Sequence, residues 1–207
     1  MGDRDKRLFG FLAESAQLDE LHIGLQEPHS LVFVDAFRIL VSSANGIDEF
    51  ANDGSYTGPF TTTNINRPRG LVSLPHLDPP QIAVASFGIM FFDLAGVEMP
   101  LKIEPPSPST SWRPHDLAHF GDGQILIATE SSGVFVASAD GSSTPPWGTK
   151  LYDADTEVRI TSLGSSFLVA TGEELLECVD LTGGCTLFAE CPEPTAVWVD
   201  EEVSRAS

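Results

Sequence analysis

Short apolar runs recur along the chain and are separated by Gly, Pro, Asn, Asp and Ser. Each repeat has a first run that ends in small or hydroxyl residues, then a turn, then a second run that usually ends in glycine. The first runs are ILVSSA, QIAVASF, ILIATE and FLVATG, and the second runs are GIDEFANDG, GIMFFDLAG, GVFVASADG and LLECVDLTGG. No segment has a long 3.6-residue apolar period, so the pattern predicts an all-β chain of short strands joined by tight hairpins.

A third element, Pro followed by two variable residues and an apolar anchor, opens each repeat. It reads PHSL, PRGL, PHDL and PTAV, and one further copy around Ile160 lacks the proline. The anchors are Leu31, Leu71, Leu117, Ile160 and Val197, which lie 37 to 46 residues apart. Three or four short strands repeated at such a period are typical of the blades of a β-propeller.

The two ends of the sequence complement each other. Residues 11–21 (FLAESAQLDEL) imitate residues 40–50 (LVSSANGIDEF), which are a second strand, a turn and the beginning of the next strand. TAVWVDEE near the other end is a first strand. We therefore expect residues 1–207 to form one five-bladed propeller, with blades of about 41 residues that start near the five anchors. Residues 7–24 would complete the blade that starts near 197, and this pairing of N- and C-terminal strands would close the ring and remove its exposed edges. The alternative is a piece of a longer propeller.

The repeat also resembles a known superfamily. Pro-x-[Gly/Ser/Ala/Asp]-[Leu/Val] with a later turn ending in Gly is similar to the repeats of the NHL, YWTD and SMP-30/gluconolactonase propellers, and it is carried by residues 28–54, 68–96, 114–141 and 158–200. For the gluconolactonase-like members the resemblance implies a divalent metal in the central channel, held by Glu, Asn and Asp from separate blades. Glu14 and Asn45 lie in turns that could face the channel mouth, but no fixed motif surrounds them, so the metal ligands stay unassigned.

The charge of the chain excludes some partners. There are 30 Asp and Glu residues against 11 Lys and Arg, which gives a net charge of −19. Nucleic acids and anionic membranes are therefore poor partners, because both need basic side chains to neutralise phosphate. No apolar run reaches about 18 residues, so no membrane insertion is expected. The first residues lack the apolar core of a signal peptide, which favours the cytoplasm, or an extracytoplasmic site if the chain is a processed fragment.

The blade entries predict a ligand site at one mouth of the channel. The basic residues at the entries are His29, Arg69, His115 and, displaced by one position, Arg159. In a propeller the turn between the second and third strands reaches the same face, which adds Glu14, Asn45 and Glu130 as candidates. Such a ring could bind an anion or a carboxylate through a focused field and charge-assisted hydrogen bonds. The alternative is that each of these side chains makes its hydrogen bonds within its own turn. Oxygen-rich turns such as 52–54 also have two explanations: they bind Ca²⁺, or their side-chain oxygens form ordinary Asx turns.

The three cysteines lie close together in the sequence, at 178, 185 and 191. Cys178 and Cys185 flank a predicted hairpin turn at 181–184 and would be diagonal neighbours on the two strands. A disulfide between them, which suits an oxidising compartment, and buried thiols, which suit the cytoplasm, both remain open. A fourth ligand for zinc is missing from this spacing. Residues 177–185, followed by CPEPTAVWVDEE, also resemble the Cys-containing repeats of extracytoplasmic bacterial propellers.

The sequence contains no G-x-S-x-G elbow, P-loop, dinucleotide-binding or H-E-x-x-H motif. We therefore expect a non-enzymatic binding or scaffold module without a cofactor, whose ligand at the channel mouth is a protein, a small molecule or a glycan. The first alternative is an SMP-30/gluconolactonase-like hydrolase that uses Ca²⁺ or another divalent metal. The second is a lectin that stacks sugars on Trp112 and Trp147, which lie in Pro- and Ser-rich loops.

Overall fold

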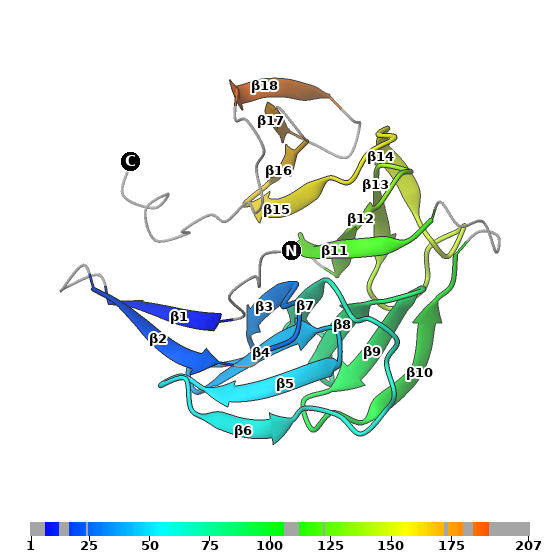
Figure 1. The fold of residues 1–207 in the computed structure, drawn as a ribbon. Helices are drawn as coiled ribbons and strands as arrows, with labels where there is room; N and C mark the ends of the chain where they lie inside the picture. The colour runs from blue at the N-terminus through cyan, green and yellow to red at the C-terminus, as the bar shows by residue number, and fades with distance from the viewer. Residues whose placement is uncertain are drawn as a thin grey trace.

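Four antiparallel sheets of four strands each follow one another along the chain and surround a common centre (Figure 1). The structure, a computed structural model, describes residues 7–12, 17–23, 25–105, 112–121, 123–171, 174–179 and 184–190. In each sheet the strands are neighbours in chain order, so every blade is a simple meander. Over these ranges no helix has the length and apolar character needed to cross a membrane.

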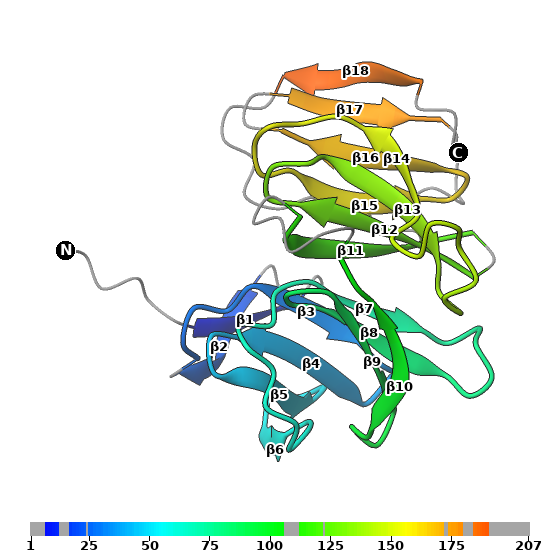
Figure 2. The same cartoon turned by 90° about the vertical axis from the view of Figure 1, so that its right-hand side faces the viewer.

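The first blade contains β3 (Ser30–Phe33), β4 (Arg38–Ser43), β5 (Gly46–Ala51) and β6 (Tyr56–Pro59), and the second contains β7 (Leu71–Leu74), β8 (Gln81–Ala85), β9 (Ile89–Asp93) and β10 (Glu98–Ile103). The third contains β11 (Pro114–Phe120), β12 (Gln124–Thr129), β13 (Val134–Ser138) and β14 (Thr149–Tyr152), and the fourth contains β15 (Arg159–Leu163), β16 (Ser166–Ala170), β17 (Glu174–Cys178) and β18 (Cys185–Glu190). Seen from the side, the first strands β3, β7, β11 and β15 lie together between the outermost strands β6 and β18 (Figure 2).

The structure confirms an all-β propeller, but it has four complete blades where the sequence predicts five. The residues predicted to complete a fifth blade form a two-stranded antiparallel sheet of β1 (Arg7–Leu12) and β2 (Gln17–Ile23). The first strand predicted near 197, and with it the closure of the ring, falls outside the described residues. Counting anchors overestimates the blades because an anchor marks one strand, whereas a blade needs four paired strands.

Alternation of side chains along the strands fills the interfaces between blades. In the second blade, Ile82 and Phe92 pack toward the first blade, whereas their chain neighbours Ala83 and Phe91 pack toward the third. All four side chains are fully buried. The second strand of a blade therefore reads as a continuous apolar run, because neighbouring blades cover both of its faces.

The residue before each apolar anchor sets how one blade meets the next. Ser30 Oγ of the first blade accepts the Leu71 N–H of the second at 3.2 Å, and Asp116 Oδ2 of the third accepts the Ile160 N–H of the fourth at 3.0 Å. Between the second and third blades this position is Gly70, which has no side chain to accept the Leu117 N–H. Asp116 accepts that N–H itself, through Oδ1 at 3.0 Å. The repeat thus satisfies the backbone N–H of the apolar anchors Leu71, Leu117 and Ile160 in more than one way.

Aspartates cap the turns between the third and fourth strands. Asp53 accepts the Ser55 N–H, Asp93 the Ala95 N–H and Asp140 the Ser142 N–H, each at 2.9 Å. The glycine that ends each run has a left-handed φ here, with values of 82° at Gly54, 77° at Gly96 and 76° at Gly141. The oxygen-rich turn at 52–54 is therefore an Asx turn, which is the simpler of the two explanations that the sequence allows.

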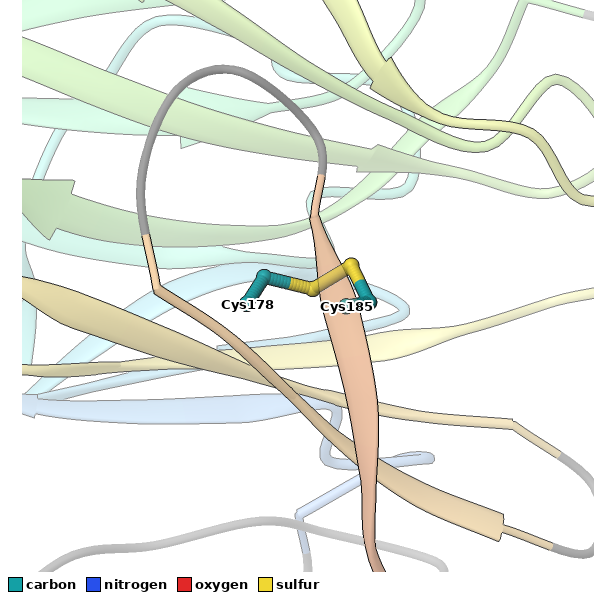
Figure 3. The surroundings of a disulfide bond; sticks show 2 residues. All are labelled: Cys178 and Cys185. Atoms are coloured by element: carbon teal, nitrogen blue, oxygen red, sulfur yellow. A yellow bond between two sulfur atoms is a disulfide. The ribbon is translucent and has the colours of Figure 1, made fainter.

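A disulfide joins Cys178 and Cys185 at the end of the β17–β18 hairpin (Figure 3). The two residues are directly opposed in the register, with their Cα atoms 4.1 Å apart, so the prediction that they are diagonal neighbours is wrong. The reason is the length of the connection: the strands end at Cys178 and resume at Cys185, so the turn is longer than the four residues assumed. Cys191 lies outside the described residues.

Removing this disulfide is expected to lower the free energy of unfolding by about 2–3 kcal/mol, the entropic value for closing a short loop. The parent protein carries Cys191→Ser, so that no third thiol can exchange with the disulfide. It is compared with the same protein carrying Cys178→Ala and Cys185→Ala in addition. Urea unfolding under non-reducing conditions gives the difference, and dithiothreitol should shift the parent but leave the double variant unchanged. Equal unfolding midpoints for the parent and the double variant would contradict the expectation.

Candidate functional site

The four innermost strands begin on one face of the propeller, called here the entry face. His29 immediately precedes β3, and Arg69 lies two residues before the start of β7. His115 is the second residue of β11, and Arg159 is the first residue of β15. The turns between second and third strands reach the same face and bring Glu130, which follows β12. The repeat places these residues together because each blade enters the ring in the same way.

Arg69 and Arg159 act electrostatically on both entry histidines. The pKa of His29 is lowered, first by partial loss of solvent and then by the positive charges of Arg69 and Arg159. Burial lowers the pKa of His115 to about 3, and the charges of Arg159 and Arg69 add to this effect. His115 is only 1% exposed, so it is a neutral, buried imidazole. The four predicted entry residues therefore lie within electrostatic range of one another.

Two glutamates contact different side chains of the entry face. Glu157 Oε1 lies 2.7 Å from Arg159 Nη2 and 3.5 Å from Nε2 of His115. Glu130 Oε1 lies 2.7 Å from Arg69 Nη1, and its Oε2 lies 3.9 Å from Arg113 Nη1. The backbone N–H of Glu130 also donates to the Arg113 carbonyl at 3.0 Å, which fixes this turn against the entry of the third blade.

The central channel contains a cavity of about 460 Å³, which His29 and Arg159 line on the entry face. Its walls are the first strands of all four blades, and its polar lining includes Ser30, Asp116 and Thr161. Burial raises the pKa of Asp116 to about 6, although its two backbone hydrogen bonds and the charge of Arg159 act in the opposite direction. The volume lies in the range of ordinary small-molecule sites.

Other predicted site residues are not part of this arrangement. Asn45 is exposed at the tip of the β4–β5 turn, where its backbone N–H donates to Ser43 Oγ at 3.3 Å. Glu14 lies outside the described residues. In the part of the chain that the structure describes, no three His, Cys, Asp or Glu side chains are grouped closely enough to hold a metal ion. These residues therefore do not fit the channel metal that the gluconolactonase-like resemblance implies.

The tryptophans are not exposed platforms. Trp112 is only 3% exposed and packs edge-on against Phe135, with 6.1 Å between the ring centroids. Trp147 is half-buried against the same core cluster. The prediction of an exposed, sugar-stacking Trp112 is therefore wrong, because this ring fills the interface between the second and third blades.

Two features were not anticipated from the sequence. His76, which follows β7, and His119, near the end of β11, stack at the other mouth of the channel with their ring centroids 4.4 Å apart. On the entry face, Arg67 and Arg113 stand directly before the prolines that open the second and third blades. The residue before the proline is charged in each of the four copies that have the proline, but it is an arginine only in the second and third repeats, so the sequence signal for a cationic pair was the occurrence of arginine in two neighbouring repeats.

Comparison with known proteins supports the fold. No model of a protein family matches the sequence, and no curated protein matches it either. A chain of the nidogen–laminin complex is similar in structure, with a TM-score of 0.70 and 12% identity over 91% of this chain and 72% of that one. A putative gluconolactonase has a TM-score of 0.61 and 13% identity over 91% of this chain and 70% of its own. The computationally designed protein Ika8 has a TM-score of 0.57 and 13% identity over 95% and 60%.

At these identities the similarity shows the fold alone. It confirms the β-propeller fold that the repeat predicts. Members of this fold that differ as much as a chain of a protein complex and a putative lactonase do not share one chemistry. The function must therefore be argued from the side chains at the entry face.

Proposed function

We propose that the protein is a non-enzymatic binding module that holds an anionic ligand at the entry-face mouth of its central channel. The observation that carries this proposal is the position of Arg159 and His29, which both line the cavity at the entry face, with the positive charge of Arg69 close enough to lower the pKa of His29. On a chain with a net charge of −19, a local group of cations is the place where a negative ligand meets the least repulsion.

The ion pair at the mouth favours exchange with a ligand. The side chains of Arg159 and Glu157 are 26% and 47% exposed, and an ion pair of this kind contributes only about 0–1 kcal/mol. A ligand carboxylate can therefore replace Glu157 on the Arg159 guanidinium at little cost, and it gains a bidentate geometry that a guanidinium favours. A small carboxylic acid or an acidic side chain of a protein would satisfy the same chemistry. The presence of this fold in the nidogen–laminin complex is consistent with a protein as the source.

Replacing Arg159 with alanine is expected to weaken citrate binding about tenfold or more in low salt, where a charge-assisted contact is least screened. Isothermal titration calorimetry measures this for the wild type and the variant. Lys150→Ala is the matched control, because Lys150 also belongs to an exposed ion pair, 2.8 Å from Asp153, but lies on the outer strand β14. No citrate binding by the wild type, or an equal loss in both variants, would contradict the proposal. Lactone hydrolysis that a chelator abolishes would favour the metal-dependent hydrolase instead.

A further inference from the structure

A second cavity, of about 370 Å³, opens on the entry face between the second and third blades. We call it the interblade pocket and define it by Arg67, Arg69, Ser86, Phe87, Arg113 and Glu130. Its walls come from the loop before β7, the turn between β8 and β9, the entry of β11 and the turn after β12. The interblade pocket is separate from the channel cavity, which is not lined by Arg67, Phe87 or Arg113.

The charge of this pocket is opposite to that of the protein. It holds three guanidinium groups and one carboxylate, whereas the whole chain carries −19. Glu130 is bound closely to Arg69, at 2.7 Å, and only distantly to Arg113, at 3.9 Å. Among the described residues Arg67 has no ion pair. Two guanidinium groups with most of their five donors available therefore face one cavity.

The backbone holds Arg67 in a fixed place. Its φ is 50°, in the left-handed region, and Glu27 has the same φ at the equivalent position before the proline of the first blade. The first two blades thus share this conformation, whereas the arginine at this position is shared by the second and third blades. Ser86 Oγ also donates to the carbonyl of Asn66 at 2.7 Å, which ties this loop to the β8–β9 turn. The guanidinium of Arg67 is carried by a preorganised loop, which limits the entropy lost on binding.

The pocket also has an apolar wall. Phe87 is 59% exposed at the tip of the β8–β9 turn, next to the serine that fixes the loop. An exposed aromatic ring beside the guanidinium groups of Arg67 and Arg113 suits a ligand that has a charged head and an apolar body.

We propose that the interblade pocket binds a doubly charged oxyanion, either a phosphate monoester or a pair of carboxylates, between Arg67 and Arg113. Glu130 keeps Arg69 as the rear wall, so the net charge left for the ligand is two, which matches a dianion. Phe87 contacts the apolar part of the ligand. This site is independent of the channel mouth, because it uses Arg67 and Arg113, whereas the proposed function uses Arg159 and His29.

The test uses calorimetric titration of the whole chain with inorganic phosphate, phenyl phosphate and succinate, and acetate serves as the singly charged comparison. We expect phosphate or succinate to bind at least about tenfold more tightly than acetate in low salt, since one charge more is engaged. Binding of phosphate alone identifies the monoester as the ligand group, and binding of succinate alone identifies paired carboxylates. The proposal is overturned if neither dianion binds better than acetate.

Variants locate the ligand. Arg67→Ala/Arg113→Ala should weaken the better dianion about tenfold or more, whereas Arg159→Ala should change its affinity by less than about twofold. Phenyl phosphate should bind more tightly than phosphate to the wild type, and Phe87→Ala should remove that difference. Circular dichroism melting checks that each variant is folded, and Arg67→Lys/Arg113→Lys keeps the charge if the alanine variant is not. Loss of dianion binding in Arg159→Ala, with none in the arginine pair, would overturn the proposal and leave the channel mouth as the site.

Discussion

The His115→Gln variant is expected to become less stable as the pH rises from about 5 to 6, while the Asp116→Asn variant is expected to become more stable over the same interval. The two side chains are neighbours on β11, and their pKa values are displaced in opposite directions. The pKa of His115 falls to about 3, whereas that of Asp116 rises to about 6. In the wild type the two effects nearly cancel in this interval.

The sign follows from which state binds the proton. Unfolded His115 takes up a proton below its ordinary pKa of 6.5 while the folded residue stays neutral, so its contribution to stability is lost as the pH falls. Folded Asp116 takes up a proton below about 6, before the unfolded residue does at 3.8, so its contribution is lost as the pH rises. Each group changes the free energy of unfolding by up to about 1.4 kcal/mol per pH unit. Removing one of the two groups leaves the pH dependence of the free energy of unfolding that the other group causes.

Urea unfolding of the wild type and both variants at about pH 5 and pH 6 measures these slopes. All other carboxylates contribute the same pH dependence to the three proteins. The quantity compared is therefore the change in the free energy of unfolding per pH unit, and a variant that is less stable at both pH values can still be compared. The two variants should differ by about 2 kcal/mol per pH unit. Parallel slopes in all three proteins would show that the pKa values of His115 and Asp116 are not displaced in the way described.

Strand positions could be predicted from the sequence because they depend on short-range alternation. The anchors Leu31, Leu71, Leu117 and Ile160 all lie in innermost strands, since an apolar residue after a proline marks where the chain enters a blade. Local patterns do not report which strands pair, so they could not show that β1 and β2 form a two-stranded sheet with each other. They also could not show that Trp112 turns inward, because its Pro- and Ser-rich neighbours are typical of an exposed loop.

The candidate site was predictable to the extent that it follows the repeat. His29, Arg69 and His115 share one position after the proline, and a ring brings equivalent positions to one face. Which cations share a carboxylate depends on the spacing between blades, so the bridges made by Glu130 and Glu157 could not be derived from the sequence. The two sites proposed on the entry face differ for the same reason: one lies on the axis of the ring, and the other lies between two blades.

Gly70→Ala is expected to destabilise the protein by about 3 kcal/mol, at the upper end of the usual cost of overpacking. A Cβ at this position would lie 2.7 Å from the Cα of Asp116 and 2.8 Å from the backbone nitrogen of Leu117. The φ of Gly70 is not in the left-handed region, so the expected effect is steric and not conformational. Because the atoms met are backbone atoms of β11, no side chain can swing away to make room.

Gly184→Ala is the matched control, since a Cβ there meets nothing within 4 Å and its φ is also outside the left-handed region. It should be neutral or slightly stabilising, because alanine restricts the unfolded chain more than glycine does. Urea unfolding compares both variants with the wild type. The clash can be relieved only by moving the third blade away from the second, which also widens the gap between Arg69 and Glu130, at present 2.7 Å. Gly70→Ala should therefore weaken dianion binding in the interblade pocket as well, and a variant as stable as the wild type would show that the close approach of these two blades does not constrain the fold.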